Sequence, residues 1–264
     1  MTTAGPSIGL TFVPQQNTPE SLPDFARMVE EGGLDELWLW EDCFSQSAIA
    51  AATVALSVTS RIRVGVALMP TPLRNVALTA MEVGTLARIY PGRLLPGIGH
   101  GLQNWMAQAG ARVASPLTLL EEYATALRGL LAGEQVTSTG RYVKLDRVQL
   151  QYPPAVVPPL YVGGFGAKTL ALAARAGDGI LLAQNGPAAA ARMAGHLADA
   201  GRRAEIVLAV GSAEGAHRVD RVGEVIREAG AAGASMVAVV PAADQSDLPE
   251  LVEAMRSAKQ SMAS

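Results

Sequence analysis

The stretch RIRVGVALMPTPLRNVALTAMEVGTLARIYPGRLLPGIGHG, residues 61–101, contains a complete strand–helix–strand unit. Its largely apolar ends, residues 61–69 and 93–99, flank a helical segment at 75–89 that stops before Pro91-Gly92. Strands that are apolar throughout, rather than alternating, are typical of a parallel sheet covered by helices. The stretch therefore predicts a right-handed strand–helix–strand crossover.

The same alternation of short apolar runs and helical segments occurs eight times along the chain. Eight such units close a barrel, whereas an open doubly wound sheet usually has about five or six strands. We therefore predict an α/β fold, a single (β/α)8 TIM barrel domain over residues 1–264. The predicted strands are residues 8–13, 34–40, 61–69, 93–99, 160–163, 180–183, 206–210 and 236–240.

Residues 134–150 interrupt the repeat between units four and five. The segment is polar, alternates in hydrophobicity, and is marked by Gly133 and Gly140. This pattern predicts a small hairpin insertion.

Composition restricts the class of protein. Of the 264 residues, 49% are hydrophobic and 17% are charged, which predicts a large core and argues against global disorder. A net charge of -3 gives no electrostatic case for nucleic acid. The single cysteine, Cys43, excludes an internal disulfide and a Cys-rich metal site, and it suits a reducing cytoplasm. No apolar run approaches ~20 residues and the first residues lack a basic segment, so neither a membrane span nor a signal peptide is expected.

In a barrel of this kind the active site lies at the carboxyl ends of the strands. Glu41 and Asp42 follow the second strand and are candidates for acid–base work, although adjacent carboxylates at a loop often cap a helix or face solvent. His100 follows the fourth strand. It has no metal-ligand partner at suitable spacing, because His196 and His217 fall on the predicted outer layer, so no metal site is expected.

Two groups of glycines follow predicted strands. Gly163, Gly164 and Gly166, with Phe165 and Ala167, come before a helix whose free N–H groups could bind a phosphate; a tight strand-to-helix turn is the alternative. Gly97, Gly99 and Gly101 could form a bare wall beside a flat ring, or they could simply relieve crowding in a curved strand.

Several apolar side chains also fall at strand ends and could line a pocket, although such residues are ordinary core in most proteins. Cys43 joins this set as a small lining residue, because no sequence neighbour would activate it as a nucleophile. The predicted pocket residues are Trp40, Cys43, Phe44, Met69 and Trp105.

Four blocks together resemble the bacterial luciferase-like flavin and deazaflavin oxidoreductases, particularly the branch that uses coenzyme F420. The blocks are LWLWEDCF, the stretch quoted above, LEEYATALRGLLAGEQVTSTGRYVKL and PPLYVGGFGAKTLALAARAGDGIL. Their order and spacing are specific to the superfamily and much less specific to any substrate. The resemblance implies hydride transfer between F420 and a small organic substrate, with the coenzyme carrying the chemistry.

The resemblance also implies roles for individual residues. The Ala67–Leu68 bond falls where the family has a non-prolyl cis peptide behind the ring, and Asp42 falls where a family acid contacts the ring. The other implied cofactor-binding residues are His100 and Gly101 beside the ring, and Gly163, Gly164, Phe165, Gly166 and Ala167 at the phosphate.

One position departs from the family pattern. Many relatives have histidine directly after the acid, where this chain has Cys43. The proton needed for the reaction must then come from Asp42, Glu41, His100 or water, and the sequence does not show which of these is the donor.

Two other functions stay open. One is an FMN-dependent monooxygenase, and the other is a cofactor-binding barrel without turnover. The helix at 76–89 is apolar on more than one face, which is compatible with a homodimer and equally with packing in one barrel.

Overall fold

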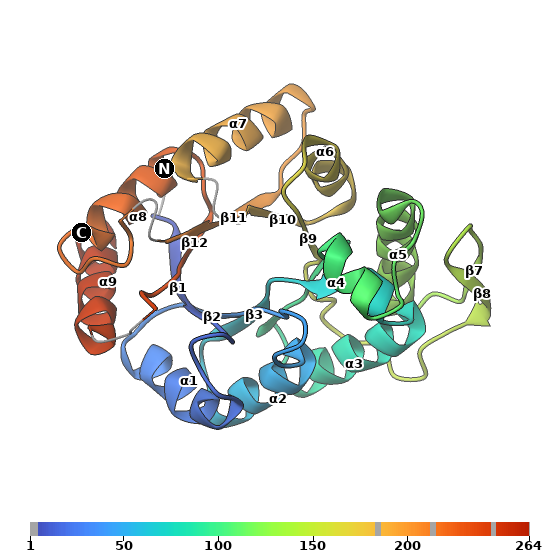
Figure 1. The fold of residues 1–264 in the computed structure, drawn as a ribbon, viewed down its shortest axis with the longest axis horizontal. Helices are drawn as coiled ribbons and strands as arrows, with labels where there is room; N and C mark the ends of the chain where they lie inside the picture. Colours follow the sequence, from blue (N-terminus) through green and yellow to red (C-terminus); the bar gives the residue numbers. More distant parts are fainter. Residues whose placement is uncertain (1–4, 183–185, 212–214, 244–246, 264) are drawn as a thin grey trace.

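The computed structural model describes residues 5–182, 186–211, 215–243 and 247–263. Within them, a curled parallel sheet is surrounded by helices (Figure 1). The strands of this sheet are β1 (Ser7–Phe12), β2 (Glu36–Leu39), β3 (Arg63–Val66), β4 (Met69–Pro70), β5 (Leu94–Leu95), β6 (Gly97–Gly99), β9 (Tyr161–Gly163), β10 (Gly179–Leu182), β11 (Glu205–Val210) and β12 (Met236–Val239).

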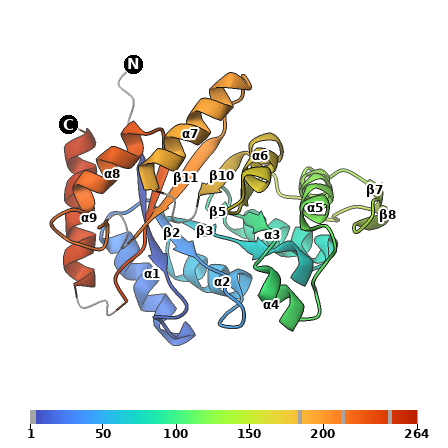
Figure 2. The ribbon, with the colours of Figure 1, turned by 45° about the horizontal axis from the view of Figure 1, so that its top comes forward.

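The helices follow the strands in alternation. They are α1 (Leu22–Glu31), α2 (Ala48–Val58), α3 (Val76–Ile89), α4 (Gln103–Gln108), α5 (Pro116–Leu131), α6 (Ala167–Ala176), α7 (Gly186–Asp199), α8 (Val222–Ala231) and α9 (Leu248–Ala263), with 3-10 turns at Pro19–Ser21 and Thr71–Leu73. The turned view separates α4, which lies at one end of the sheet, from the helices around its outside (Figure 2).

The predicted strands are confirmed in type and order, with two interruptions. The third predicted strand is divided into β3 and β4 at Ala67–Leu68, and the fourth into β5 and β6 at Pro96. The Ala67–Leu68 peptide bond is cis, as predicted, and so is Cys43–Phe44. Residue 183, the last of the sixth predicted strand, lies outside the described residues.

The strand pairings follow chain order. β1 pairs with β2 and with β12, β2 pairs with β3, and β9 to β12 pair in succession. β5 pairs with β3, while β6 pairs with both β4 and β9. Outside this sheet, β7 (Val136–Thr139) and β8 (Lys144–Val148) pair antiparallel, next to α5.

Local sequence signals begin and end the helices. The side chain of Ser47 accepts a hydrogen bond from the backbone N–H of Ala50 at the start of α2, and that of Asn75 accepts one from Ala77 at the start of α3. α3 ends just before Pro91-Gly92, where Gly92 adopts a φ of +74° that glycine tolerates without strain.

Strand side chains divide between two hydrophobic clusters. On β10, Ile180 and Leu182 pack in the cluster shared with the helices, while Leu181 belongs to a separate inner cluster. On β12, Val237 and Val239 likewise face the helices. The strands are therefore apolar on both faces because both are buried, which is why they read as continuous apolar runs. The inner cluster consists of Trp38, Leu95, Tyr161, Leu181, Val207, Met236 and Ala238.

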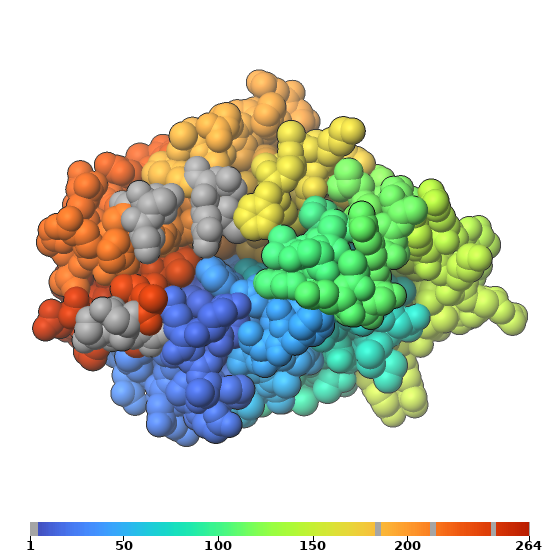
Figure 3. Space-filling view, in the orientation of Figure 1, coloured from blue at the N-terminus to red at the C-terminus, as the bar shows by residue number. Residues whose placement is uncertain are grey.

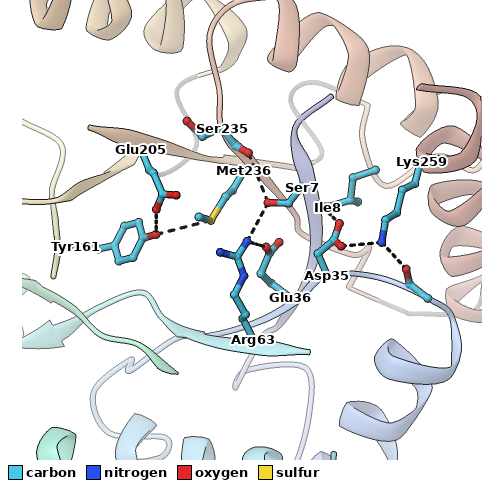
Figure 4. A network of polar contacts seen from close by, with 11 residues as sticks. Ser7, Ile8, Asp35, Glu36, Arg63, Tyr161, Glu205, Ser235, Met236 and Lys259 are labelled. Atoms are coloured by element: carbon cyan, nitrogen blue, oxygen red, sulfur yellow. Dashed lines mark hydrogen bonds and ion pairs between the residues drawn. The ribbon is translucent and has the colours of Figure 1, made fainter. Parts of the chain in front are cut away.

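A polar network lies at the amino ends of these strands (Figure 4). Arg63 forms an ion pair with the fully buried Glu36 and donates to Ser7 Oγ at 3.2 Å. The hydroxyl of Tyr161 donates to Glu205. Burial raises the pKa of Glu36 and outweighs the opposing effect of Arg63, and burial followed by the bond to Glu205 raises the pKa of Tyr161.

Candidate functional site

A cavity of about 280 Å³ opens at the carboxyl ends of the parallel strands, where such folds place their sites. The green segment that contains α4 lies against the yellow segment before α6 near the middle of this face (Figure 3). The lining residues are mostly apolar: Trp38, Trp40, Glu41, Asp42, Ala67, Leu68, Pro70, His100, Gly101, Leu102, Trp105, Gly163, Gly164, Phe165, Leu181, Leu182, Val207, Ala209 and Ala238.

Glu41 lines the cavity, but its carboxylate is committed to the protein. Oε1 forms an ion pair with Arg74, and Oε2 accepts the backbone N–H of Ala48 at 2.8 Å, at the start of α2. The side chain is only 8% exposed. A second carboxylate, Glu82, lies 3.7 Å from Arg74 Nε, and burial raises its pKa against the attraction of Arg74. Glu41 therefore fastens β2 to α2 and is poorly placed to exchange protons.

Asp42 makes fewer contacts with other polar groups of the described chain than Glu41 does. Its Oδ2 accepts a hydrogen bond from Gln15 Nε2 at 2.7 Å, in an exposed position. The side chain lines the cavity. Of the two adjacent carboxylates, Asp42 is thus the one that can exchange its hydrogen-bond partner for a ligand.

Both ring nitrogens of His100 contact other residues. Nδ1 lies 2.8 Å from the carbonyl oxygen of Gly101, and Nε2 lies 3.1 Å from Thr169 Oγ1. Because a carbonyl only accepts, Nδ1 carries the proton in this arrangement, and Nε2 of the neutral ring accepts from the Thr169 hydroxyl. The imidazole therefore connects the loop after β6 to the first turn of α6.

The amino end of α6 lies at the cavity edge and has free donors. Gly166 is its N-cap residue, and no side chain of the described residues caps it. The first N–H groups of a helix have no partner within the helix and favour an anion. In contrast, the corresponding end of α2 is bound by the Glu41 carboxylate. The start of α6 can therefore hold a phosphate.

One wall of the cavity is closely packed through glycine. A Cβ at Gly99 would lie 2.6 Å from Leu68 Cδ1 and 2.9 Å from the carbonyl oxygen of Gly163, and a Cβ at Gly163 would lie 2.6 Å from Leu181 Cβ. Only glycine lets these strands and the Leu68 side chain approach so closely. Ala67 and Leu68 also line the cavity, and their apolar side chains could contact a planar ring there.

The predicted residues do not all come together. Glu41, Asp42, His100, Gly101, Ala67, Leu68, Trp40, Trp105 and the run Gly163–Phe165 line the cavity, whereas Gly166 and Ala167 lie beside it at the start of α6.

Three predicted pocket residues are absent from the lining. Met69 is buried in the helix-facing cluster, next to the inward-facing Leu68, and Phe44 is 69% exposed. Cys43 is a partly buried free thiol. Burial raises the pKa of this thiol, and the carboxylates of Glu41 and Asp42 raise it further. A thiolate nucleophile is therefore disfavoured at neutral pH.

Several lining residues were not predicted from the sequence, because they lie within strands and not after them. Trp38, Leu181, Val207 and Ala238 lie inside strands and face inward, and their alternation along each strand is the signal that could have identified them. Among the described residues, no three His, Cys, Asp or Glu side chains gather as they would around a metal ion. Within the same residues, no helix is long and apolar enough to cross a bilayer.

Curated relatives match over part of their length. The chain is 32% identical over 181 residues to 5,10-methylenetetrahydromethanopterin reductase of Methanolobus tindarius, covering 69% of this chain and 55% of that protein. It is 31% identical over 188 residues to an F420-dependent glucose-6-phosphate dehydrogenase of Kineococcus radiotolerans, covering 66% and 55%. The chain thus spans about half the length of these relatives.

Solved structures share the fold over nearly the whole chain. The F420-dependent tetrahydromethanopterin reductase of Methanopyrus kandleri superposes with a TM-score of 0.75 at 17% identity, covering 96% of this chain and 98% of that one. An F420-dependent secondary alcohol dehydrogenase in complex with an F420-acetone adduct gives 0.77 at 18% identity, covering 96% and 98%. A type II Baeyer-Villiger monooxygenase component from Pseudomonas putida, in complex with FMN, gives 0.76 at 15% identity, covering 96% and 97%.

The family model described as luciferase-like monooxygenase matches residues 6–258, nearly the entire chain. Together with the fold and the position of the cavity, this match establishes that the chain belongs to the luciferase-like monooxygenase family.

Proposed function

We propose that this protein is an oxidoreductase that transfers a hydride between coenzyme F420 and a small organic substrate. The observation that carries the proposal is an apolar cavity at the carboxyl ends of the strands with the uncapped start of α6 at its edge. Such a cavity suits a flat ring joined to a phosphate. The F420-dependent relatives described above agree with this proposal.

The residues present fit this cofactor. The Ala67–Leu68 surface would support one face of the ring, and the backbone N–H groups at the start of α6 would bind the phosphate. Trp40 and Trp105 would cover the substrate. The bound deazaflavin supplies the hydride-carrying carbon, while the protein supplies orientation and excludes water.

Asp42 is the residue that we assign to proton exchange. It lines the cavity and, among the described residues, bonds only the exposed amide of Gln15, whereas Glu41 is held by Arg74 and Ala48 and His100 by Gly101 and Thr169. A group that moves a proton must be able to change partners during turnover. Asp42 fits this requirement best among the candidate residues.

Paired binding titrations test the proposal. Purified protein is titrated with F420 and with FMN, using cofactor fluorescence as the readout. We expect F420 to bind more tightly than FMN, and a substrate screen for hydride transfer would follow. Binding of neither cofactor would contradict the proposal and leave only the fold.

The second candidate is an FMN-dependent monooxygenase, favoured by the structural likeness to the FMN complex from Pseudomonas putida. A preference for FMN, with oxygen consumption by the reduced complex, would support it. A protein that binds a cofactor but turns over no partner would be a cofactor-binding barrel without turnover.

We also infer that the eight strand–helix units form one complete (β/α)8 barrel domain over residues 1–264, with β7 and β8 as a small hairpin insertion. Support comes from the pairing of β6 with both β4 and β9, and of β12 with β1.

A homodimer through α3 is part of the same proposal, because Leu78, Met81 and Ile89 are exposed on this helix. Sedimentation of the wild type should give a dimer, and Met81→Asp should give a monomer. A wild-type monomer would contradict it.

A further inference from the structure

Trp38 is a cavity residue with no role in the function proposed above. It lies on β2, is 1% exposed, and forms part of both the inner cluster and the cavity lining. Its ring meets that of Tyr161 edge to face, with 6.0 Å between centroids and an angle of 86°. The indole is therefore fixed in position inside the sheet.

Two glycines on neighbouring strands determine how the indole is turned. Its benzo ring fills the space that a side chain at Gly65 on β3 would need. Its Cδ1, the carbon bonded to Nε1, lies 2.8 Å from where a Cβ at Gly9 on β1 would be. The N–H edge of the indole thus lies on the β1 side of the ring.

This N–H has no hydrogen-bond partner among the described residues, although it is buried. The hydroxyl of Tyr161, which donates to Glu205 (Figure 4), does not accept a hydrogen bond from this N–H either. Thr11 is the register partner of Trp38 on β1, and its buried Oγ1 likewise has no partner in the described chain. A buried donor left unpaired costs about 1–3 kcal/mol, so proteins rarely keep one without use.

The remaining lining around Trp38 offers no acceptor side chain. Leu181, Val207, Ala209 and Ala238 are apolar, and the last two are small, which leaves room beside the indole. Among the described residues no side chain accepts from this N–H, so a molecule bound in the cavity can supply the acceptor.

We propose that the N–H of Trp38, which lines the cavity, together with the hydroxyl of Thr11, its buried register partner on β1, forms a subsite for the carbonyl oxygen of a bound ligand. The subsite rests on the proposed function, and the oxygen belongs either to a ring carbonyl of the cofactor or to a carbonyl substrate. An indole N–H only donates and a threonine hydroxyl can donate, so together they match the two lone pairs of one carbonyl oxygen. A carboxylate or phosphate is disfavoured, because no Lys or Arg lines the cavity in the described residues.

The test uses Thr11→Val, which keeps the shape of the side chain and removes the donor, and Trp38→Phe, which removes the donor together with part of the ring volume. Thr53→Val on α2, which is exposed and does not line the cavity, is the matched control for Thr11→Val. The indole N–H resonance of Trp38, assigned by its loss in Trp38→Phe, is followed in nitrogen-15-labelled protein during titration with F420, FMN and cyclohexanone. Thermal melting of the ligand-free variants is recorded in parallel.

We expect one of these probes to move the Trp38 N–H resonance downfield. Trp38→Phe and Thr11→Val should each weaken that probe by about five- to tenfold, with non-additive effects in the double variant. The Thr11→Val melting temperature should be equal to or above that of the wild type, because an unpaired buried hydroxyl is removed, whereas Trp38→Phe should lower it because the smaller ring leaves a cavity. A response to F420 or FMN assigns the oxygen to the cofactor, and a response to cyclohexanone assigns it to the substrate.

An unchanged Trp38 resonance with all three probes, together with unchanged affinities in both variants, overturns the subsite and leaves a buried water as the partner of the N–H. This outcome is distinct from failure of the proposed function, in which wild-type protein binds neither F420 nor FMN while the cyclohexanone titration still tests the subsite.

Discussion

Nε2 of His100 lies 3.1 Å from Oγ1 of Thr169, so that a residue after β6 is fastened to the first turn of α6. Thr169 is buried, and its hydroxyl is hydrogen-bonded to His100 and not to solvent. The contact links the proposed ring surface to the proposed phosphate site. In the proposed function His100 is therefore a positioning residue, and we expect its influence on a bound cofactor to pass through α6.

Thr169→Val should loosen this link. We expect cofactor affinity to fall by about three- to tenfold, since one neutral hydrogen bond is lost, while turnover at saturation changes little. Thr169→Ser keeps the hydroxyl and should bind as the wild type does. Fluorescence titration and steady-state kinetics measure the two quantities. A large loss of kcat with unchanged affinity would instead indicate that His100 takes part in the chemistry.

Substitutions of Glu41 and Asp42 should have different effects, because the first should lower stability and the second should lower activity. Glu41→Ala leaves the largely buried Arg74 with only the more distant Glu82 among the described residues and removes the acceptor of the Ala48 N–H, which should cost about 3 kcal/mol and lower the melting temperature by roughly 6–12 °C. Asp42→Asn should change stability by less than about 0.5 kcal/mol and lower turnover about a hundredfold. Calorimetry and kinetics on both variants check this. Equal melting temperatures for the two would contradict the structural role of Glu41.

Alanine substitutions of Gly99 and Gly166 form a matched pair, because the first glycine is closely packed and the second is not. Gly99→Ala forces a methyl group against Leu68 and the carbonyl of Gly163, and overpacking of this kind costs about 1–3 kcal/mol. At Gly166 the nearest atom is Thr169 Oγ1 at 3.9 Å and φ is -85°, so Gly166→Ala should alter stability by no more than about 0.5 kcal/mol. Urea denaturation compares the two free energies of unfolding.

The Cys43 thiol should react slowly at neutral pH. Burial and the two neighbouring carboxylates raise its pKa, so the reactive thiolate forms only at a higher pH than for an ordinary cysteine. The rate of alkylation by iodoacetamide should therefore rise only in the alkaline range, and Asp42→Asn should shift that rise toward lower pH. Fast labelling at pH 7 would show that the thiol is ionised there.

Much of the fold could be predicted because both faces of each strand are buried. The strands around Ile8, Val64 and Val237 are apolar throughout, and a parallel sheet covered by helices buries both faces of such strands. What periodicity could not predict was short or irregular. α4 has six residues without a side-chain cap, and Pro96 interrupts the fourth strand without ending it.

The site was harder to predict for a related reason. In a strand buried on both sides, the sequence does not show which residues face the cavity. Met69 was therefore predicted to line the pocket, whereas in the structure Leu68 lines it and Met69 packs in the cluster shared with the helices. Trp38 was treated as part of a strand for the same reason. Glu41 looked equivalent to Asp42 because its partner Arg74 is 33 residues away in sequence.

The network around Arg63 and Tyr161 has a kinetic consequence. Glu36, Tyr161 and Met236 are fully buried at the amino ends of the strands, so the interior is filled on that side and the cavity has its mouth on the other. If the cofactor and the substrate stack in this cavity as proposed, the molecule bound deeper must arrive first and leave last. Steady-state turnover should therefore follow a compulsory order, with the deeper molecule competing only against its own product.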